Sequence, residues 1–294
     1  MPFVVGVARS GTTLLRLMLD AHPELAIPHE THFIPAALQE PQASREAFFR
    51  RLAEFSTWED LSTPAERFAE ELRRVEPFNV PDGLRAFYRL YAETHGKPRW
   101  GDKTPSYNLH MRTIHAALPE ARFIHLLRDG RDVAVSLRHL WFSPGESMET
   151  LAAYWADQIV ETRRQGQGTP FYLEVRYEDL ITRPVRELER ICRFIDLPYA
   201  SEMLTYHHSA RRRLDEVETR RDADGRVVIT KEERLHNHRF TSQPPEPSRI
   251  GRWRTEMTSA MLAAFEEAAG EMLDDLGYER GSRQRPRWLA WLRG

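Results

Sequence analysis

The stretch from 3 to 15 constrains the fold of this chain more than any other part of its sequence. A short apolar run over 3–5 leads into a loop bounded by Gly6 and Gly11, and a helical pattern starts at once at Thr12. In such a strand–loop–helix unit, backbone N–H groups and a helix N-terminus converge on one point and bind an anion there. The residues expected to donate hydrogen bonds to a phosphate are Ser10, Gly11, Thr12 and Thr13.

The spacing of this loop matches that of loops that bind nucleoside triphosphates, except that Thr12 stands where those loops carry a lysine. That lysine contacts the β- and γ-phosphates, so its absence disfavours a triphosphate donor. Arg9 places a cation at the mouth of the loop instead. Two alternatives stay open on these residues: a nucleotide kinase, which would need Mg²⁺-dependent turnover of ATP, and a non-catalytic nucleotide-binding protein.

Later segments alternate between strand and helix patterns. Apolar runs over 122–127 and 171–176 are typical of buried strands, and helical patterns follow from Val133 to Trp141, over 147–165 and from Pro184 onward. The apolar face of the first of these helices is expected to hold Val133, Leu137, Leu140 and Trp141. This alternation predicts an α/β fold of the P-loop-like, three-layer kind, with a mainly parallel central sheet flanked by helices. Ligands of such sheets bind at the carboxyl ends of the strands.

Two regions depart from this alternation. Residues 36–98 form a helical, charged pattern with many aromatic side chains, which is expected to be an insertion covering one side of the ligand site; helix packing is the alternative role for any one of these aromatic residues. Residues 206–248 are polar and charged, and we expect a long surface loop or lid whose histidines are solvated. Asp224 and Gly225 can turn a small hairpin within it. With both regions included, 1–294 is expected to be one domain.

Composition bounds the classes of function. Lys and Arg number 42 against 44 Asp and Glu, a net charge of −2 that disfavours a broad nucleic-acid surface. Cys192 is the single cysteine, which excludes an intrachain disulfide and a cysteine-based zinc site. No apolar run reaches the length of a membrane span, and the first strand leaves no room for a signal peptide, so we expect a cytoplasmic protein. No metal site is expected, and a homodimer is compatible with the sequence.

A second anion site is expected where the strand over 122–127 ends. Arg128 follows that strand directly, and Ser136 lies two turns into the next helix. An arginine fork and a hydroxyl can share one dianion. An ion pair of Arg128 with Asp129 or Asp132 is the alternative for this loop taken alone.

Four segments in chain order resemble motifs of the sulfotransferase family. Residues 6–23 look like its 5′-phosphosulfate loop, and are closest to the tyrosylprotein sulfotransferases and to bacterial members. Residues 123–136 are similar to its 3′-phosphate motif. The family's later nucleotide-contacting segments are matched by 177–179 and 251–254, which adds Tyr177, Gly251 and Arg252 to the expected nucleotide contacts. The resemblance leaves 36–98 and 206–248 uncovered.

The resemblance implies 3′-phosphoadenosine 5′-phosphosulfate (PAPS) as donor and 3′-phosphoadenosine 5′-phosphate (PAP) as product. This donor carries one 5′-phosphate bearing sulfate, which explains the missing lysine, and a 3′-phosphate for Arg128 and Ser136. Arg9 and Lys103 match family positions that neutralise charge on the transferring group, in a reaction that depends on positioning and electrostatics.

The base implied by the resemblance is Glu30. Cytosolic aryl and steroid sulfotransferases use a histidine just after a Lys-Thr pair, but Pro105 follows Lys103 and Thr104 here. Tyrosylprotein sulfotransferases carry a Glu-Thr pair after the second strand, which Glu30 matches. His32 stands where those enzymes have an arginine, so the expected acceptor is the hydroxyl, or an amine, of a small molecule or glycan rather than a protein tyrosine.

Overall fold

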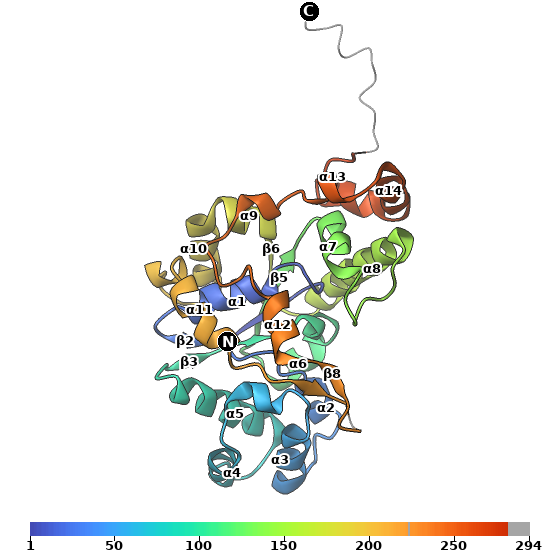
Figure 1. Ribbon diagram of the computed structural model, residues 1–294. Helices are drawn as coiled ribbons and strands as arrows, with labels where there is room; N and C mark the ends of the chain where they lie inside the picture. The colour runs from blue at the N-terminus through green and yellow to red at the C-terminus, as the bar shows by residue number, and fades with distance from the viewer. Residues whose placement is uncertain (223, 282–294) are drawn as a thin grey trace, which may run out of the picture.

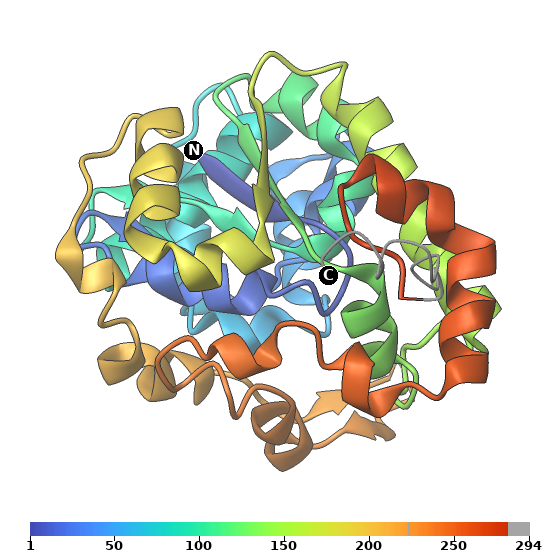
Figure 2. The same cartoon turned by 90° about the horizontal axis from the view of Figure 1, so that it is seen from above.

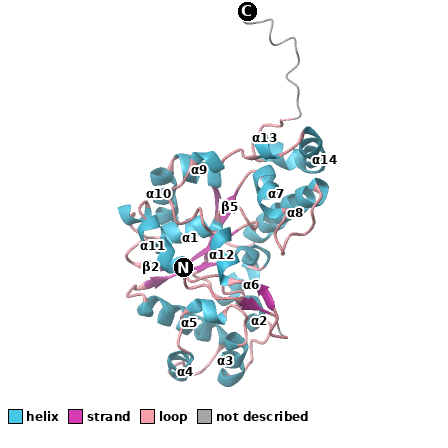
Figure 3. Ribbon diagram, viewed as in Figure 1, coloured by secondary structure: helices cyan, strands magenta, loops and turns pink. Residues whose placement is uncertain are grey.

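A parallel four-stranded sheet organises the computed structural model, which describes residues 1–222 and 224–281. The strand order is β4-β1-β5-β6. The four strands are β1 Pro2–Val5, β4 Asp102–Lys103, β5 Arg122–Leu127 and β6 Tyr172–Arg176. Val4 pairs with both Lys103 and Ile124 in register, so the carboxyl ends of these strands meet at one edge of the sheet. Helices lie on both sides of it (Figure 3), which confirms the predicted α/β class.

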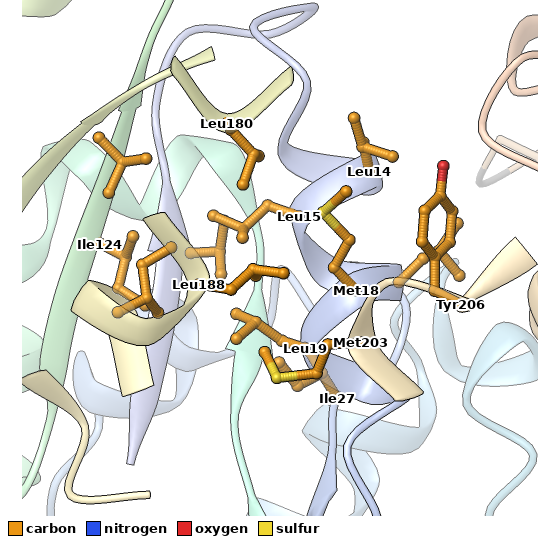
Figure 4. Close-up of a cluster of buried hydrophobic side chains, with 14 of the residues drawn as sticks. Leu14, Leu15, Met18, Leu19, Ile27, Ile124, Leu180, Leu188, Met203 and Tyr206 are labelled. Atoms are coloured by element: carbon orange, nitrogen blue, oxygen red, sulfur yellow. The ribbon is translucent and has the colours of Figure 1, made fainter. Parts of the chain in front are cut away.

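The sheet separates two apolar cores because side chains alternate along β1. Val4 faces a core that includes Leu15 and Leu19 of α1 (Thr12–Asp20), whereas Phe3 and Val5 face the other core. Figure 4 shows α1 against the first core. The helices that enclose this core with it are α9 Tyr177–Thr182, α10 Pro184–Phe194 and α11 His207–Leu214. Each fully buried leucine contributes about 1.5–3 kcal/mol, so α1 is fixed firmly behind the loop that precedes it.

The predicted helical insertion is present and lies on the opposite side (Figure 1). Its elements are α2 Ile34–Leu38, α3 Arg45–Ala53, the 3-10 turn η1 Trp58–Leu61, α4 Ala65–Arg73 and α5 Val80–Thr94. The Phe68 and Phe87 rings pack edge to face with centroids 5.6 Å apart, and both side chains are fully buried. These aromatic side chains are therefore a packing core.

Short elements join the insertion to the sheet. They are the parallel pair β2 Leu25–Ala26 and β3 Arg99–Trp100, then η2 Pro105–Leu109 and α6 Met111–Ala117. A third core lies among α7 Gly130–Leu137, α8 Met148–Gly166 and α14 Ser259–Asp275. In Figure 2 these helices lie side by side, with α13 (Trp253–Glu256) leading into α14. Every described helix is too short or too polar to cross a bilayer.

The expectation for 206–248 was partly wrong. The predicted hairpin forms, with β7 Arg220–Arg221 antiparallel to β8 Val227–Ile229 and Gly225 at φ 77° in the turn. The rest holds α11, α12 Lys231–Asn237 and the start of η4 Pro247–Arg249 instead of a continuous loop, and η3 Ser201–Met203 lies just before the segment. Thr230 begins α12 with a capping box that includes Glu233.

Two other predictions need correction. The helix expected from Val133 to Trp141 begins earlier, at Gly130, and ends at Leu137. Trp141 lies beyond it with 52% of its surface exposed, so Trp141 does not extend the apolar face. The strand expected to be buried over 171–176 is β6, at the edge of the sheet, where only Val175 is fully covered. An edge strand has a neighbour on one side alone, so its other side chains stay half-buried.

Candidate active site

The loop between β1 and α1 has the shape of an anion cradle. Gly6, Arg9 and Gly11 have φ values of 145°, 72° and 99°, which turn the chain sharply around the loop. No side chain caps the N-terminus of α1. Ser10 Oγ is buried and has no hydrogen-bond partner among the described residues, so a bound anion would satisfy it.

Tyr177 closes one side of this loop. A Cβ atom added at Gly11 would lie 2.6 Å from Cδ2 of the Tyr177 ring, so only glycine fits there. Two residues predicted to contact the nucleotide, 166 positions apart in sequence, are thus in direct contact.

Glu30 and Lys103 meet beside the anion loop. Lys103 Nζ donates to Glu30 Oε1 at 2.6 Å and to Thr13 Oγ1 at 3.5 Å, and His32 Nε2 lies 3.0 Å from Glu30 Oε2. The register of β4 against β1 places Lys103 there, and Thr31 holds the Glu30 loop by donating its N–H to Thr104 Oγ1 at 3.0 Å. The two predicted catalytic residues are therefore adjacent.

The charges of this pair are coupled. Burial favours the neutral form of Glu30, but Lys103 and His32 outweigh burial and hold the pKa of Glu30 well below its ordinary value. Burial lowers the pKa of Lys103, and Glu30 opposes that effect. Glu30 is thus an ionised carboxylate at neutral pH, able to accept a proton.

Arg9 joins the anion loop to two other segments. Its Nε donates to Ser136 Oγ at 3.0 Å and its Nη2 to the carbonyl of Asn237 at 3.4 Å. Burial, followed by the charges of Arg128 and Arg249, lowers the pKa of Arg9 to about 10. These arginines repel one another, as expected of groups arranged to share an anion.

Arg128 is buried between two backbone carbonyls. Its Nη1 donates to the carbonyl of Arg9 at 3.2 Å and its Nη2 to that of Arg249 at 2.7 Å, while its Nε has no partner among the described residues. Asp132 Oδ2 lies 3.6 Å away, so the ion pair considered as an alternative is also present. The guanidinium lies over the Tyr177 ring, 4.3 Å from its centre.

One cavity of about 580 Å³ is lined by Arg9, Glu30, Lys103, Arg128 and Tyr177, and its volume is within the usual range for small-molecule sites. Among the described residues, six cations line it against two carboxylates, although the whole chain carries a net charge of −2. The cations are Arg9, Lys103, Arg128, Arg220, Arg234 and Arg249, and the carboxylates are Glu30 and Glu246. Of the insertion, Thr57 alone among the described residues reaches the cavity.

A model described as the sulfotransferase family matches residues 3–201, more than half of the chain. The chain belongs to the sulfotransferase family. It is therefore an enzyme of a family that transfers sulfuryl groups.

Curated relatives share the family. A putative protein-tyrosine sulfotransferase of Caenorhabditis briggsae is 32% identical over 212 residues, which cover 70% of this chain and 68% of that protein. The nodulation protein NoeE of Sinorhizobium fredii is 26% identical over 95% of this chain and 66% of its own length. Protein-tyrosine sulfotransferase A of Caenorhabditis elegans is 29% identical, and the match spans 70% of this chain and 52% of that protein. The chain thus spans about half to two thirds of the length of these relatives.

Solved structures share the fold. The sulfotransferase domain from the curacin biosynthetic pathway superposes with a TM-score of 0.61 at 19% identity, covering 95% of this chain and 98% of that one. The sulfotransferase domain from the Synechococcus PCC 7002 olefin synthase gives 0.58 at 23% identity, over 92% and 94% of the two chains. The P-loop-like fold predicted from sequence is therefore that of a sulfotransferase.

Two predicted nucleotide contacts of this sulfotransferase lie outside the main cavity. Gly251 and Arg252 line an adjoining hollow that shares Arg249 with it. The Gly251 N–H donates to Asp132 Oδ2 at 2.8 Å, and Arg252 pairs with Glu256. Arg249, which the sequence reasoning missed, links the two hollows.

The expectation of solvated histidines was wrong for His238. This side chain, at the end of α12, lines the cavity of the sulfotransferase, next to the Asn237 carbonyl that Arg9 contacts. Burial, then the charges of Arg9 and Lys103, lowers the pKa of His238 to about 3, so it is neutral at pH 7. No pattern within 206–248 distinguishes it from the neighbouring His236.

His29 is part of the framework. It is buried, and its Nε2 lies 2.9 Å from the Arg213 carbonyl and 3.1 Å from Arg16 Nη1. Burial and the charge of Arg16 hold the pKa of His29 well below its usual range. No metal-binding group of His, Cys, Asp or Glu occurs within 1–222 and 224–281.

Asp102, also missed by sequence reasoning, holds the Glu30 loop in place through Thr31. It is fully buried and accepts from Thr31 Oγ1 and from the Tyr88 hydroxyl, each at 2.8 Å. The Tyr107 hydroxyl lies 2.8 Å from the same Thr31 oxygen. Thr31 and Asp102 each neighbour a predicted catalytic residue, so this network fixes Glu30 relative to Lys103.

Proposed function

We propose that this sulfotransferase moves a sulfuryl group from PAPS to the hydroxyl, or less favourably an amine, of a small-molecule or glycan acceptor. The observation that carries the proposal is the 2.6 Å contact between Lys103 and Glu30 beside Thr13 of the anion loop. In this proposal, Glu30 is the base and Lys103 the cation beside the transferring group.

The family implies PAPS as donor and PAP as product. In this proposal the anion loop of Ser10, Gly11, Thr12 and Thr13 holds the 5′-phosphosulfate. Arg128, Ser136 and Tyr177 line the same cavity and would take the 3′-phosphate end. The buried, unsatisfied Ser10 Oγ and Arg128 Nε favour a ligand with anionic groups at both places.

The chemistry follows from the charges. The acceptor oxygen attacks sulfur, the bond from sulfur to the 5′-phosphate oxygen breaks, and PAP leaves with the electron pair. Glu30 takes the acceptor proton. Lys103 leaves its contact with Glu30 to neutralise the departing oxygen, while Arg9 neutralises the sulfuryl oxygens; one such donor is typically worth about 3–4 kcal/mol of the barrier.

Nucleotide binding tests the donor. Calorimetric titration with PAP and with ATP should show tight binding of PAP and weak binding of ATP, because Thr12 replaces the lysine that serves a triphosphate. Binding of ATP without PAP would favour the kinase alternative and overturn the proposal.

Glu30→Gln tests the base. Loss of a general base should lower kcat by roughly 10²- to 10⁴-fold, with PAP affinity nearly unchanged, measured with labelled donor. His32→Gln is the matched control, because it removes the other partner of Glu30 and keeps the carboxylate. Equal turnover by Glu30→Gln and the wild type would remove Glu30 as base.

A further inference from the structure

Arg220 is a cavity cation left without a carboxylate. Its side chain is half-buried, and within the described ranges neither an ion pair nor a side-chain hydrogen bond is present for it. Its guanidinium lies 5.7 Å from the centre of the Trp141 ring. Arg234 differs: it lines the same cavity but is bound by both oxygens of Asp60, at 2.9 and 2.6 Å.

The hairpin directs Arg220 inward. Arg220 pairs with Ile229 across β7 and β8, and both line the cavity, whereas the next pair, Arg221 with Val227, is exposed. The ladder is irregular between these two pairs, and Val227 and Val228 are both exposed before the buried Ile229, so the covered part of the hairpin ladder is the Arg220–Ile229 pair. Glu218, just before the hairpin, donates its N–H to Asp60 Oδ1 at 2.8 Å, so the hairpin is held against the insertion.

This wall of the cavity is separate from the nucleotide residues. Trp141 and Phe142 belong to the loop after α7, where 52% and 41% of their surfaces are exposed although they line the cavity. Val217 and Ile229 add apolar surface on the hairpin side. No acidic residue of the described hairpin lines the cavity. The wall is therefore apolar with one unpaired guanidinium.

We propose that the acceptor carries an anionic group, which Arg220 binds, on an apolar body that packs against Trp141 and Phe142. This inference rests on the proposed function and adds the acceptor class to it. In the proposed function the donor takes Arg9, Lys103 and Arg128. Arg249 lines the adjoining hollow with Gly251 and Arg252, and Arg234 is paired with Asp60. Among the described cavity cations, this leaves Arg220 for the acceptor. A guanidinium binds a carboxylate and a phosphate by the same two-pronged geometry, so both anions are acceptable.

A set of phenols that differ in charge tests whether the acceptor carries an anionic group. The acceptors are 4-hydroxyphenylacetate, 4-hydroxyphenyl phosphate, neutral p-cresol and cationic tyramine, assayed with labelled PAPS on the full chain. We expect kcat/KM for the two anions to exceed that for p-cresol by about tenfold or more, as for hydrogen bonds to a charged group, and tyramine to be poorest. The ratio of the two anions tells a carboxylate site from a phosphate site.

Two neighbouring substitutions test the residue. Arg220→Gln should remove the preference for anions and leave kcat/KM for p-cresol nearly unchanged. Arg221→Gln is the control, because this arginine is on the outer face, donates to the Gly225 carbonyl and should keep the preference. Trp141→Ala should raise KM for all four acceptors alike.

The outcomes separate this inference from the proposed function. Transfer with no preference for anions, or a preference that survives Arg220→Gln, overturns the inference and leaves the sulfotransferase reaction intact. If none of the four phenols is sulfated, calorimetric titration of the PAP complex decides: 4-hydroxyphenylacetate binding no tighter than p-cresol overturns the inference. Failure to bind PAP counts against the proposed function instead.

Discussion

The absence of a Cβ atom at Gly11 allows both the backbone conformation of the anion loop and its close approach to Tyr177. Its φ of 99° disfavours other residues, and a Cβ there would meet the Tyr177 ring at 2.6 Å. Gly11→Ala should weaken PAP binding by about tenfold or more, since the loop or the ring must move and a charged-group hydrogen bond is lost. Calorimetry measures this change.

Gly96 supplies the matched control for that experiment. It also has a positive φ, 67°, but an added Cβ would meet nothing within 4 Å. Gly96→Ala should cost about 1–2 kcal/mol of unfolding free energy from the left-handed conformation alone and leave PAP affinity unchanged. Similar PAP affinities for the two variants would contradict the role assigned to Gly11.

Asp102 makes stability depend on pH. Burial raises the pKa of Asp102 to about 6, despite the hydrogen bonds from Tyr88 and Thr31. The folded state therefore binds this proton more tightly than the unfolded chain does, so the contribution is fully present below the unfolded pKa near 3.8 and is lost as pH rises through 6. Relative to Asp102→Asn, wild-type unfolding free energy should fall by about 2–3 kcal/mol between pH 3.5 and pH 7. Urea denaturation at each pH measures the difference, and a constant difference would contradict the shift.

At the scale of elements, sequence periodicity predicted the helices and strands whose positions depend on nearby residues. The β1–α1 unit and the strand over 122–127 were predicted correctly, because each combines a strongly apolar run with a clear boundary. Trp141 continues the helical period of α7 but lies outside the helix, which periodicity alone cannot reveal. The roles predicted for Glu30 and Lys103 depended on the family resemblance. Their contact was not predicted, since nothing in either loop indicates the register of β4 against β1.

The segment 206–248 shows where prediction from sequence ends. Its Asp224-Gly225 turn is a local signal and was found, and the Thr230 capping box is a local signal that could have revealed α12. The inward position of His238 carries no local signal. It results from contacts between distant residues, above all the Arg234–Asp60 pair that binds α12 to the insertion.

The Arg234–Asp60 pair should limit local opening of the segment 206–248. Asp60 is buried and is held by Arg234 and by the N–H of Glu218, so Asp60→Asn leaves a guanidinium without its charge partner. Removing one partner of a buried pair costs about 3–5 kcal/mol, and we expect faster amide hydrogen exchange over 206–248 and a higher acceptor KM. Lys231→Ala, which removes an exposed pair with Glu218, is the control and should change exchange little. Equal hydrogen exchange in both variants would show that the Arg234–Asp60 pair does not hold this segment in place.

At the scale of the whole molecule, charge is distributed unevenly. The chain has a net charge of −2, yet six cations and two carboxylates line the cavity in the part of the chain that the structure describes. Burial is the largest cause that lowers the pKa of Arg9 to about 10 and that lowers the pKa of Arg249. Repulsion from neighbouring arginines, Arg128 among them, adds to the lowering of both. We therefore expect the ligand-free protein to be less stable because of the cations at the proposed anion site.

Arg249→Ala should have opposite effects on the stability of the ligand-free protein and on its affinity for PAP. Removing one of the mutually repelling cations should leave the ligand-free protein as stable as the wild type or more so, although the contact of Arg249 with the Phe240 ring is lost. PAP at 100 times its Kd stabilises the wild type by about 2.7 kcal/mol, and at the same PAP concentration the rise in Tm should be smaller in the variant because its affinity is weaker. Scanning calorimetry with and without PAP measures both effects.

Arg226→Ala replaces an exposed arginine at the hairpin tip. It controls for the loss of one positive charge and should change neither the stability nor the PAP-induced rise in Tm. A PAP-induced shift as large in Arg249→Ala as in the wild type would show that this arginine is not part of the anion site.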